Sequence, residues 1–334
     1  MIGDELAGRV RQSRMPRDLA KGELSKQLAS AEQLRSVTIP FIIFTMIWGS
    51  TWIVIRSQLG AVPPQWSVTY RFAIAAVAMA AVALWKRESL KLGREALLPA
   101  IFLGFTQFCI NFNAVYLAER HITSGVVATV FALLLIPASL MGWAFLGHRP
   151  SRRFAWSSLV AVSGVALLFV HEMREHHTDA NEILVGIGIT LVGMLGAAIA
   201  NVTQARPEIR RFPLFPMLAW SMAAGAIIDA LIAFAMTGPP SFDARPAYWL
   251  GVLYLALFAS VLTFSLYYPV IRRIGPAKAA YSSVLVPIIA MGFSTWLEDY
   301  RWTGLTIAGA VLALGGMAAA LRRDRSGVPA PDAA

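Results

Sequence analysis

Ten long apolar runs follow one another along this chain of 334 residues, separated by short polar stretches. Each run is about 20 residues long, the length that an α-helix needs to cross a hydrocarbon core roughly 30 Å thick. Backbone N–H and C=O groups in lipid must be bonded internally, so only helices and closed barrels can cross. Residues 74–84 and 307–321 are apolar on all sides, whereas barrel strands alternate apolar and polar residues. The sequence therefore predicts an all-α integral membrane protein.

The predicted membrane-spanning helices cover residues 38–55, 65–85, 97–117, 123–146, 154–170, 183–205, 212–236, 248–270, 277–297 and 302–321. Charged residues make up only 14% of the chain, whereas an ordinary soluble domain has about a quarter. The single cysteine, Cys109, lies inside an apolar run and is expected to be a packing residue. The connections are too short for a soluble catalytic domain.

Lysine and arginine residues alternate in number from one loop to the next, which predicts the orientation of the chain. With the N-terminus inside, the inner segments hold 23 of them and the outer segments hold five, while Arg71 lies within a span. This asymmetry follows the positive-inside rule at every loop and places both termini in the cytoplasm. The net charge of +10 therefore indicates membrane topology and not a nucleic-acid partner.

The two halves of the chain resemble each other. A shift of 150 residues aligns Arg56 with Arg206, Phe108 with Phe258, Pro137 with Pro287 and Gly142 with Gly292. Each half holds five predicted spans, an odd number, so the second half is inverted relative to the first. Inverted repeats in helical membrane proteins are typical of secondary transporters, in which two similar halves exchange conformations and open a site to either side.

Several short motifs occur in the same order as in a known family. They are Trp48-Gly49-Ser50-Thr51-Trp52 in the first span, Tyr70-Arg71-Phe72 in the second, Pro137 with Leu146-Gly147-His148 in the fourth, Ser163-Gly164 in the fifth, Val286-Pro287 with Trp296-Leu297-Glu298 in the ninth, and Gly315-Gly316 in the tenth. With this order the chain resembles the drug/metabolite transporter (DMT) superfamily, EamA type, over roughly residues 38–322. The first repeat departs from the family pattern by carrying His148 where a Glu is common.

The resemblance implies a ten-helix basket whose central cavity lies between the halves and is lined by helices 1, 3, 4, 6, 8 and 9. It divides the chain into a cytoplasmic tail (1–37), a first EamA-like repeat (38–171), a second repeat (183–322) and a C-terminal tail (323–334). Members export amino acids, including aromatic ones, and other metabolites. No cofactor and no ATP are implied, and a monomer is compatible with this plan.

Two prolines and a set of polar and aromatic residues are the candidates for the transport site. Pro137 and Pro287 each remove a helical hydrogen bond, and the resulting kinks would shape the cavity or permit gating. Polar amides inside a bilayer have to face protein or water, so they either contact substrate or join helices. The expected substrate-binding residues are Trp48, Thr51, Gln107, Asn111, Phe131, Asn201, Gln204, Tyr267 and Tyr281, with Trp52 and Tyr268 as further aromatic candidates.

Three other groups of polar residues are candidates for a functional role. Arg71 lies about 9 Å into the second span, where snorkelling toward the interface is preferred over anion binding. Asp229 is the one acid well inside a span and is the candidate for proton coupling, although the resemblance puts its helix outside the cavity. His171, His176 and His177 share a loop with Glu172 and Glu175, but their order does not match a zinc-protease motif.

The function expected from these features is secondary transport of small amphipathic metabolites, foremost amino acids and aromatic amino acids, by alternating access and in the export direction. A bacterial inner (plasma) membrane is the expected location. The alternatives within the same fold are a drug carrier and a sugar-phosphate or nucleotide-sugar carrier, which would need several buried cations. A membrane-embedded enzyme would need a nucleophile–base pair or a metal cluster at bilayer depth, and a channel would need a polar filter.

Overall fold

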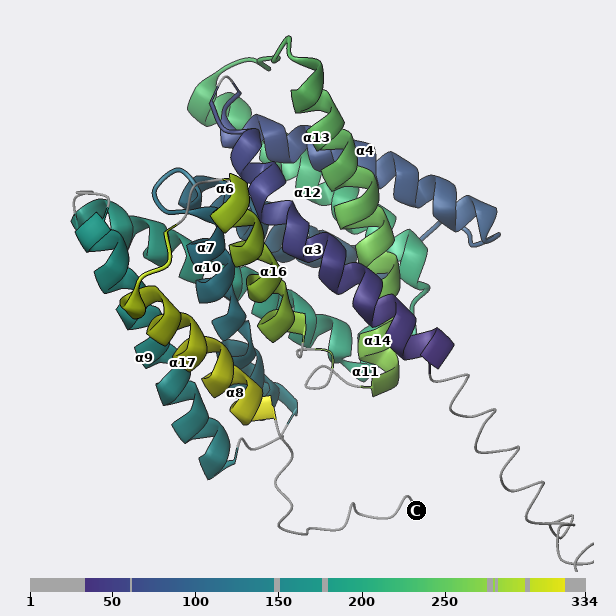
Figure 1. The fold of residues 1–334 in the computed structure, drawn as a ribbon. Helices are drawn as coiled ribbons and strands as arrows, with labels where there is room; N and C mark the ends of the chain where they lie inside the picture. Colours follow the sequence, from purple (N-terminus) through teal and green to yellow (C-terminus); the bar gives the residue numbers. More distant parts are fainter. Residues whose placement is uncertain are drawn as a thin grey trace, which may run out of the picture.

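The computed structural model describes residues 34–321, except residue 61 and the segments 147–150, 176–179, 275–278, 280–281 and 298–300 (Figure 1). The described residues form helices joined by short connections and include no strand, so the all-α prediction is confirmed. Seven of the helices are long and apolar enough to cross a membrane. They cover Ser36–Ser57, Pro64–Trp85, Arg94–Ala118, Ser124–Phe145, Asn181–Ala205, Leu214–Thr237 and Pro246–Arg273.

Helices are also present at the other three predicted spans. The fifth span coincides with α9, and two shorter apolar helices cover Leu285–Leu297 and Gly304–Ala319. Ten crossings and cytoplasmic termini therefore stay predictions, whereas a multi-pass membrane protein is established.

Seven of the long helices are continuous: α3 (Ile39–Ser57), α4 (Pro64–Trp85), α9 (Arg152–Glu175), α10 (Ala180–Ala205), α12 (Leu214–Thr237), α16 (Ser282–Leu297) and α17 (Gly304–Leu321). The others contain a change of helical type. They are α5 (Arg94–Leu103) with η2 (Gly104–Asn111) and α6 (Phe112–Ala118); α7 (Ser124–Phe131) with η3 (Ala132–Leu134) and α8 (Leu135–Leu146); and α13 (Pro246–Ala256) with η4 (Leu257–Leu262) and α14 (Thr263–Ile274). The short elements are η1 (Leu34–Thr38) and α11 (Pro207–Arg210).

Two of the composite helices contain a π-helical segment at corresponding places. The long helices of the described residues are numbered here as helices 1 to 10 in chain order, so that helices 1, 2, 7 and 9 are α3, α4, α12 and α16. Helix 3 consists of α5, η2 and α6 and is interrupted by η2, and helix 8 consists of α13, η4 and α14 and is interrupted by η4. A shift of 150 residues carries η4 onto residues 107–112, which overlap η2. π-Helical turns inside α-helices are rare and occur often at functional sites, so the two halves share an uncommon local feature.

Equivalent helices of the two halves make equivalent contacts with each other and with the opposite half. The most extensive pairs are α9 with α17 and α4 with α12, and each pair joins equivalent helices of the two halves. In addition, α3 contacts η4 and α14, while its counterpart α10 contacts η2 and α6. Figure 1 shows α9 and α17 side by side, with α3 running beside α16 and α14. This reciprocal pattern is the one that two copies related by a two-fold axis make.

Glycine allows α9 and α17 to approach closely. A Cβ atom added at Gly164 would lie 2.3 Å from the backbone nitrogen of Ala313, and one added at Gly316 would lie 2.6 Å from that of Ala161. Both distances are far below van der Waals contact, so a larger residue at either position would separate the helices. Helices in membranes associate through small residues of this kind, because lipid provides no hydrophobic driving force between them.

Large apolar side chains remain on the outer surface of the bundle. Val77, Leu98, Trp156, Leu231 and Val311 are each at least 65% exposed. Continuous apolar surface of this extent is unusual on a soluble monomer. A surrounding bilayer accounts for it, since lipid tails take the place of water around these side chains.

Candidate functional site

The Trp48–Trp52 motif holds α3 against two other helices. Trp48 Nε1 donates to the carbonyl oxygen of Ala259 in η4 at 3.2 Å. Ser50 Oγ and the Tyr254 hydroxyl of α13 share a hydrogen bond of 2.6 Å. A Cβ atom at Gly49 would lie 2.4 Å from Cγ2 of Ile289 in α16, so this position has room only for glycine. The motif therefore brings helices 1, 8 and 9 together.

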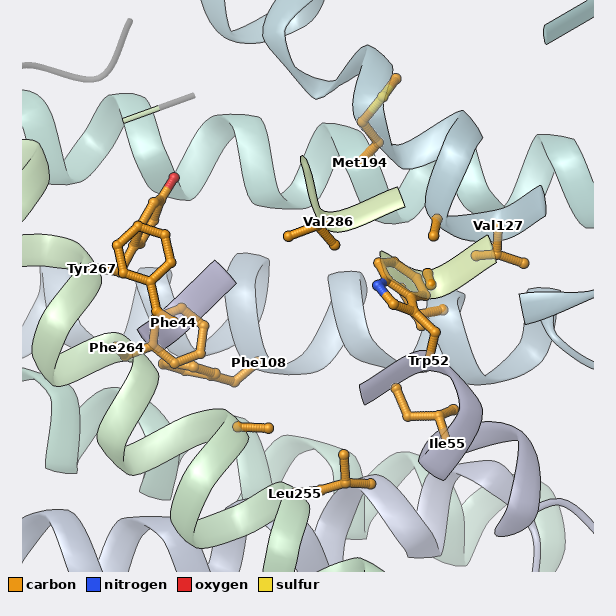
Figure 2. Packing of buried hydrophobic residues seen from close by; sticks show 14 of the residues in the cluster. Phe44, Trp52, Ile55, Phe108, Val127, Met194, Leu255, Phe264, Tyr267 and Val286 are labelled. Atoms are coloured by element: carbon orange, nitrogen blue, oxygen red, sulfur yellow. The ribbon is translucent and has the colours of Figure 1, made fainter. Parts of the chain in front are cut away.

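An aromatic cluster, defined here as Phe44, Trp48, Phe264 and Tyr267, lies between α3 and α14. The Trp48 and Tyr267 rings are 4.7 Å apart, and the Trp48 and Phe264 rings are 5.6 Å apart, both in edge-to-face arrangements. Phe44 is 5.3 Å from Tyr267. Figure 2 shows Phe44, Phe264 and Tyr267 gathered in one group. Two of the predicted site residues, Trp48 and Tyr267, thus meet directly.

Other aromatic candidates form a second, separate group. The rings of Trp52 and Phe131 are 5.6 Å apart, which joins α3 to α7. In Figure 2, Trp52 lies beside Val127 and away from the aromatic cluster, with Val286 in the space between. Trp52 Nε1 is buried and has no hydrogen-bond partner. Thr51 Oγ1 donates within α3 to the Trp48 carbonyl at 2.7 Å and is satisfied locally.

The polar candidates on α10 lie close to the aromatic cluster. Asn201 is buried, and its side chain interacts with the Tyr267 hydroxyl. Gln204, one turn further on, is also buried, and its Oε1 has no hydrogen-bond partner. An amide and a phenol at the edge of an aromatic cluster provide donors and acceptors beside an apolar surface, which is the make-up of a site for an amphipathic molecule.

Gln107 and Asn111 lie in the π-helical segment η2, a feature that sequence periodicity did not predict. Both are buried, and Asn111 Oδ1 has no hydrogen-bond partner. The backbone of Asn111 packs against Gly193 of α10, where an added Cβ atom would lie 3.0 Å from the Asn111 carbonyl oxygen.

The two prolines lie in corresponding helices but in different surroundings. Pro137 is half-buried and follows the 3₁₀ turn η3, which interrupts its helix over Ala132–Leu134. That turn includes Leu133, the residue four before Pro137, whose carbonyl oxygen the proline cannot bond. Pro287 is buried inside α16, which continues through it to Leu297.

Asp229 of α12 is fully buried and contacts helix 3. Asn113 Nδ2 donates to Asp229 Oδ1 at 2.6 Å and also to the Cys109 carbonyl at 3.0 Å. Asp229 Oδ2 is buried without a hydrogen-bond partner. The carboxyl group lies between α12 and η2, where the Asn113 amide donates to it and the Cys109 side chain lies beside it.

Arg71 is buried deep in the protein, so the prediction that it snorkels to the membrane surface is wrong. Its exposed fraction is 1%. Its Nε donates to Ser260 Oγ of η4 at 3.1 Å, and its guanidinium carbon lies 4.3 Å from the ring centroid of Phe112 in α6. The Tyr70-Arg71-Phe72 motif pointed to this position, but only the packing of α4 against helices 3 and 8 revealed the burial.

Two histidines join helix ends that come from different halves. His121 Nδ1 is hydrogen-bonded to Glu182 Oε2 at the start of α10. His171 Nδ1 lies 3.1 Å from Thr303 Oγ1 just before α17. Within the described ranges, no group of three or more potential metal ligands occurs. Five residues singled out in the sequence lie outside the described residues: His148, His176, His177, Tyr281 and Glu298.

The chain is similar to transporters across most of its length. The model of the EamA-like transporter family matches residues 36–170 and 184–322. YoaV of Bacillus subtilis, an uncharacterized transporter, is 23% identical over 272 residues, which cover 81% of this chain and 91% of YoaV. The inner membrane transporter YedA of Escherichia coli K12 is 27% identical over 257 residues, which cover 75% of this chain and 79% of YedA.

Two further relatives extend the comparison. A protein of Escherichia coli K12 named "Probable amino-acid metabolite efflux pump" is 22% identical over 293 residues, covering 83% of this chain and 91% of that protein. A crystal structure superimposes with a TM-score of 0.64 at 21% identity, covering 85% of this chain and 95% of the other, which supports the fold alone. With both of its halves matched by the family model, the chain is a membrane transporter that belongs to the EamA-like transporter family.

Proposed function

We propose that this transporter exports amino acids or closely related amphipathic metabolites, with aromatic amino acids as the first class to test. The observation that carries this proposal is the aromatic cluster with Asn201 at its edge. Trp48 and Tyr267 provide apolar ring faces, while the Asn201 and Gln204 side chains provide polar groups on the neighbouring helix. A molecule with a ring at one end and charged groups at the other matches both.

The reciprocal contacts of the two halves support alternating access as the mechanism. Equivalent helices pair across the two-fold relation, and both halves carry a π-helical segment at the same place. Two similar halves in opposite orientation can exchange conformations, which requires an odd number of crossings in each half. We therefore propose ten crossings, two inverted repeats and cytoplasmic termini in a bacterial inner membrane.

The candidate site combines residues from both halves. Trp48, Thr51, Gln107, Asn111 and Phe131 come from the first repeat, and Asn201, Gln204, Tyr267 and Tyr281 come from the second. Pro137 and Pro287 would act as hinges of the fourth and ninth helices. The efflux-pump relatives of Escherichia coli and Salmonella typhimurium are named for amino-acid metabolites, which favours this class for the present chain.

A sugar-phosphate or nucleotide-sugar carrier is less favoured by the charges inside the bundle. A phosphate group is usually bound by several cationic side chains. Within the part of the chain that is described, Arg71 is the fully buried cation of the spans, and Arg272 at the end of α14 is half-buried. One buried guanidinium suits a single carboxylate better than a phosphate ester.

The proposal is tested with the full chain reconstituted in liposomes. Labelled tryptophan or phenylalanine is supplied under a pH gradient of either sign, with unlabelled threonine, other amino acids and UDP-sugars as competitors. We expect saturable uptake that amino acids inhibit and UDP-sugars do not. No uptake of any amino acid by vesicles that contain folded protein would remove this substrate class.

A further inference from the structure

We propose that Arg71 is the residue that binds the carboxylate group of the transported molecule. This inference rests on the proposed function, because it assigns a chemical class to the substrate of the same site. In the described part of the chain, Arg71 carries a buried positive charge, and no carboxylate is paired with it. The aromatic cluster would hold the apolar part of the molecule, and Arg71 would hold its acidic end.

The guanidinium of Arg71 is incompletely satisfied. Nε donates to Ser260, and the Tyr116 hydroxyl is the other polar group that interacts with it. Tyr116 in turn donates to Gln58 Oε1 at 2.8 Å, so its oxygen is free to accept. Nη1 of Arg71 is buried and has no hydrogen-bond partner. Among the interactions of Arg71 in the described structure, none is an ion pair with a carboxylate.

A buried charge of this kind is costly for a membrane protein to keep. Charged side chains inside a bilayer pair with one another or serve a function, because removing an ion from water is unfavourable. Two aromatic rings partly offset the cost, since the guanidinium carbon lies 4.3 Å from the Phe112 centroid and 5.1 Å from that of Phe72. Cation–π contacts are weaker than an ion pair, so a carboxylate would be the stronger partner.

The position of Arg71 links it to the aromatic cluster. Trp48 bonds to Ala259 and Arg71 bonds to Ser260, so helices 1 and 2 attach to consecutive residues of the π-helical segment η4. Consecutive Cα atoms are ~3.8 Å apart, so the two attachments are close enough for one small molecule to reach both. The rings of Phe264, Phe108 and Phe72 continue from the cluster toward Arg71, at successive separations of 5.3 and 5.0 Å.

Access to Arg71 requires only local movement. Phe112, whose ring centroid lies 4.3 Å from the guanidinium carbon, is half-buried, unlike the fully buried Phe72 beside it. Phe112 also stands at the junction of η2 and α6, where the helix changes its hydrogen-bonding pattern. Rotation of this ring would uncover the face of the guanidinium that it now covers. A fork of guanidinium donors would then match the two oxygens of a carboxylate.

The experiment compares three ligands as inhibitors of labelled tryptophan uptake into liposomes. Indole-3-propionate keeps the carboxylate and lacks the amine, tryptamine keeps the amine and lacks the carboxylate, and tryptophan has both. For the wild type we expect tryptamine to inhibit at least about tenfold more weakly than indole-3-propionate. In Arg71→Gln, inhibition by the two carboxylates should weaken by roughly 10- to 100-fold, while tryptamine changes less than about twofold.

Two further variants separate recognition from folding. Arg71→Lys keeps the charge and should keep the preference for carboxylates at lower affinity, even if Arg71→Gln fails to fold. Ser260→Ala removes a hydrogen-bond partner of Arg71 and leaves the charge, so it should also keep the preference. Equal inhibition by tryptamine and indole-3-propionate in the wild type, or an equal loss for both in Arg71→Gln, would overturn the assignment and leave amino-acid transport intact. Absence of amino-acid uptake by the wild type would instead overturn the proposed function, and this inference with it.

Discussion

Replacing Gly164 by alanine should destabilise the protein, although alanine is the better helix former. The new Cβ atom would lie 2.3 Å from the Ala313 nitrogen and 2.5 Å from the Gly309 carbonyl oxygen, both on the backbone of α17. Backbone cannot rotate aside as a side chain can, so α9 and α17 must separate by roughly 1 Å. A gap of that size removes a quarter to a half of the dispersion attraction across the affected contacts.

The expected change in the free energy of unfolding is the difference between a destabilising and a stabilising contribution. Overpacking a close contact costs about 1–3 kcal/mol, and this clash with backbone falls at the upper end. Alanine in place of glycine stabilises the folded helix by about 0.5–1 kcal/mol. We therefore expect Gly164→Ala to lower the free energy of unfolding by about 2 kcal/mol.

Gly315 provides a matched control in the partner helix. It is exposed, and a Cβ atom there would meet no atom within 4 Å. Gly315→Ala should therefore raise stability by about 0.5–1 kcal/mol. The assay is unfolding of the purified protein in detergent, followed by circular dichroism as temperature or denaturant increases. If the two variants unfold at the same midpoint, the close packing of α9 on α17 is refuted.

Three other predictions concern single side chains. Trp48→Phe keeps a ring in the aromatic cluster but loses the hydrogen bond to the Ala259 carbonyl, so the KM for the substrate should rise about fivefold. Trp48→Ala also removes the ring and should raise the KM more than about tenfold. An unchanged KM in both variants would remove Trp48 from the site. In vesicles, Asp229→Asn should abolish substrate accumulation driven by a proton gradient and should retain exchange of labelled for unlabelled substrate. Equal dependence of accumulation on the gradient in the variant and the wild type would exclude Asp229 as the coupling group. The Cys109 side chain is 3% exposed, so it should react with a maleimide only after the protein unfolds, which mass spectrometry can follow. Rapid labelling of the folded protein would contradict the packing of Cys109 against helix 7.

The membrane-spanning helices could be predicted from the sequence because lipid imposes one simple rule. Each predicted span overlaps a helix, and α4 and α13 each begin with a proline, Pro64 and Pro246. The π-helical segments could not be predicted, because the residues of η2 fit an apolar helix of either type. Their position depends on how helix 3 packs between α10 and α12, which is a tertiary effect.

The candidate site was predictable in its residue types and not in its arrangement. Trp48 and Tyr267 are more than two hundred residues apart, and their contact depends on the pairing of α3 with α14. The depth of Arg71 along its helix predicted that its side chain reaches the membrane interface. That prediction failed because the distance from a helix end does not show which side of the helix other helices cover. Asp229 was expected on an outer helix, but its contact with Asn113 turns it toward helix 3.

As proposed above, this chain is a carrier whose two halves alternately open a shared amino-acid site. Counterflow distinguishes such a carrier from a channel: liposomes containing the protein are preloaded with unlabelled tryptophan, diluted into labelled tryptophan and compared with empty vesicles. A carrier returns to the outside faster when loaded, so preloading should produce a transient accumulation of label above equilibrium. Uptake that is identical with and without preloading would contradict alternating access and favour a channel.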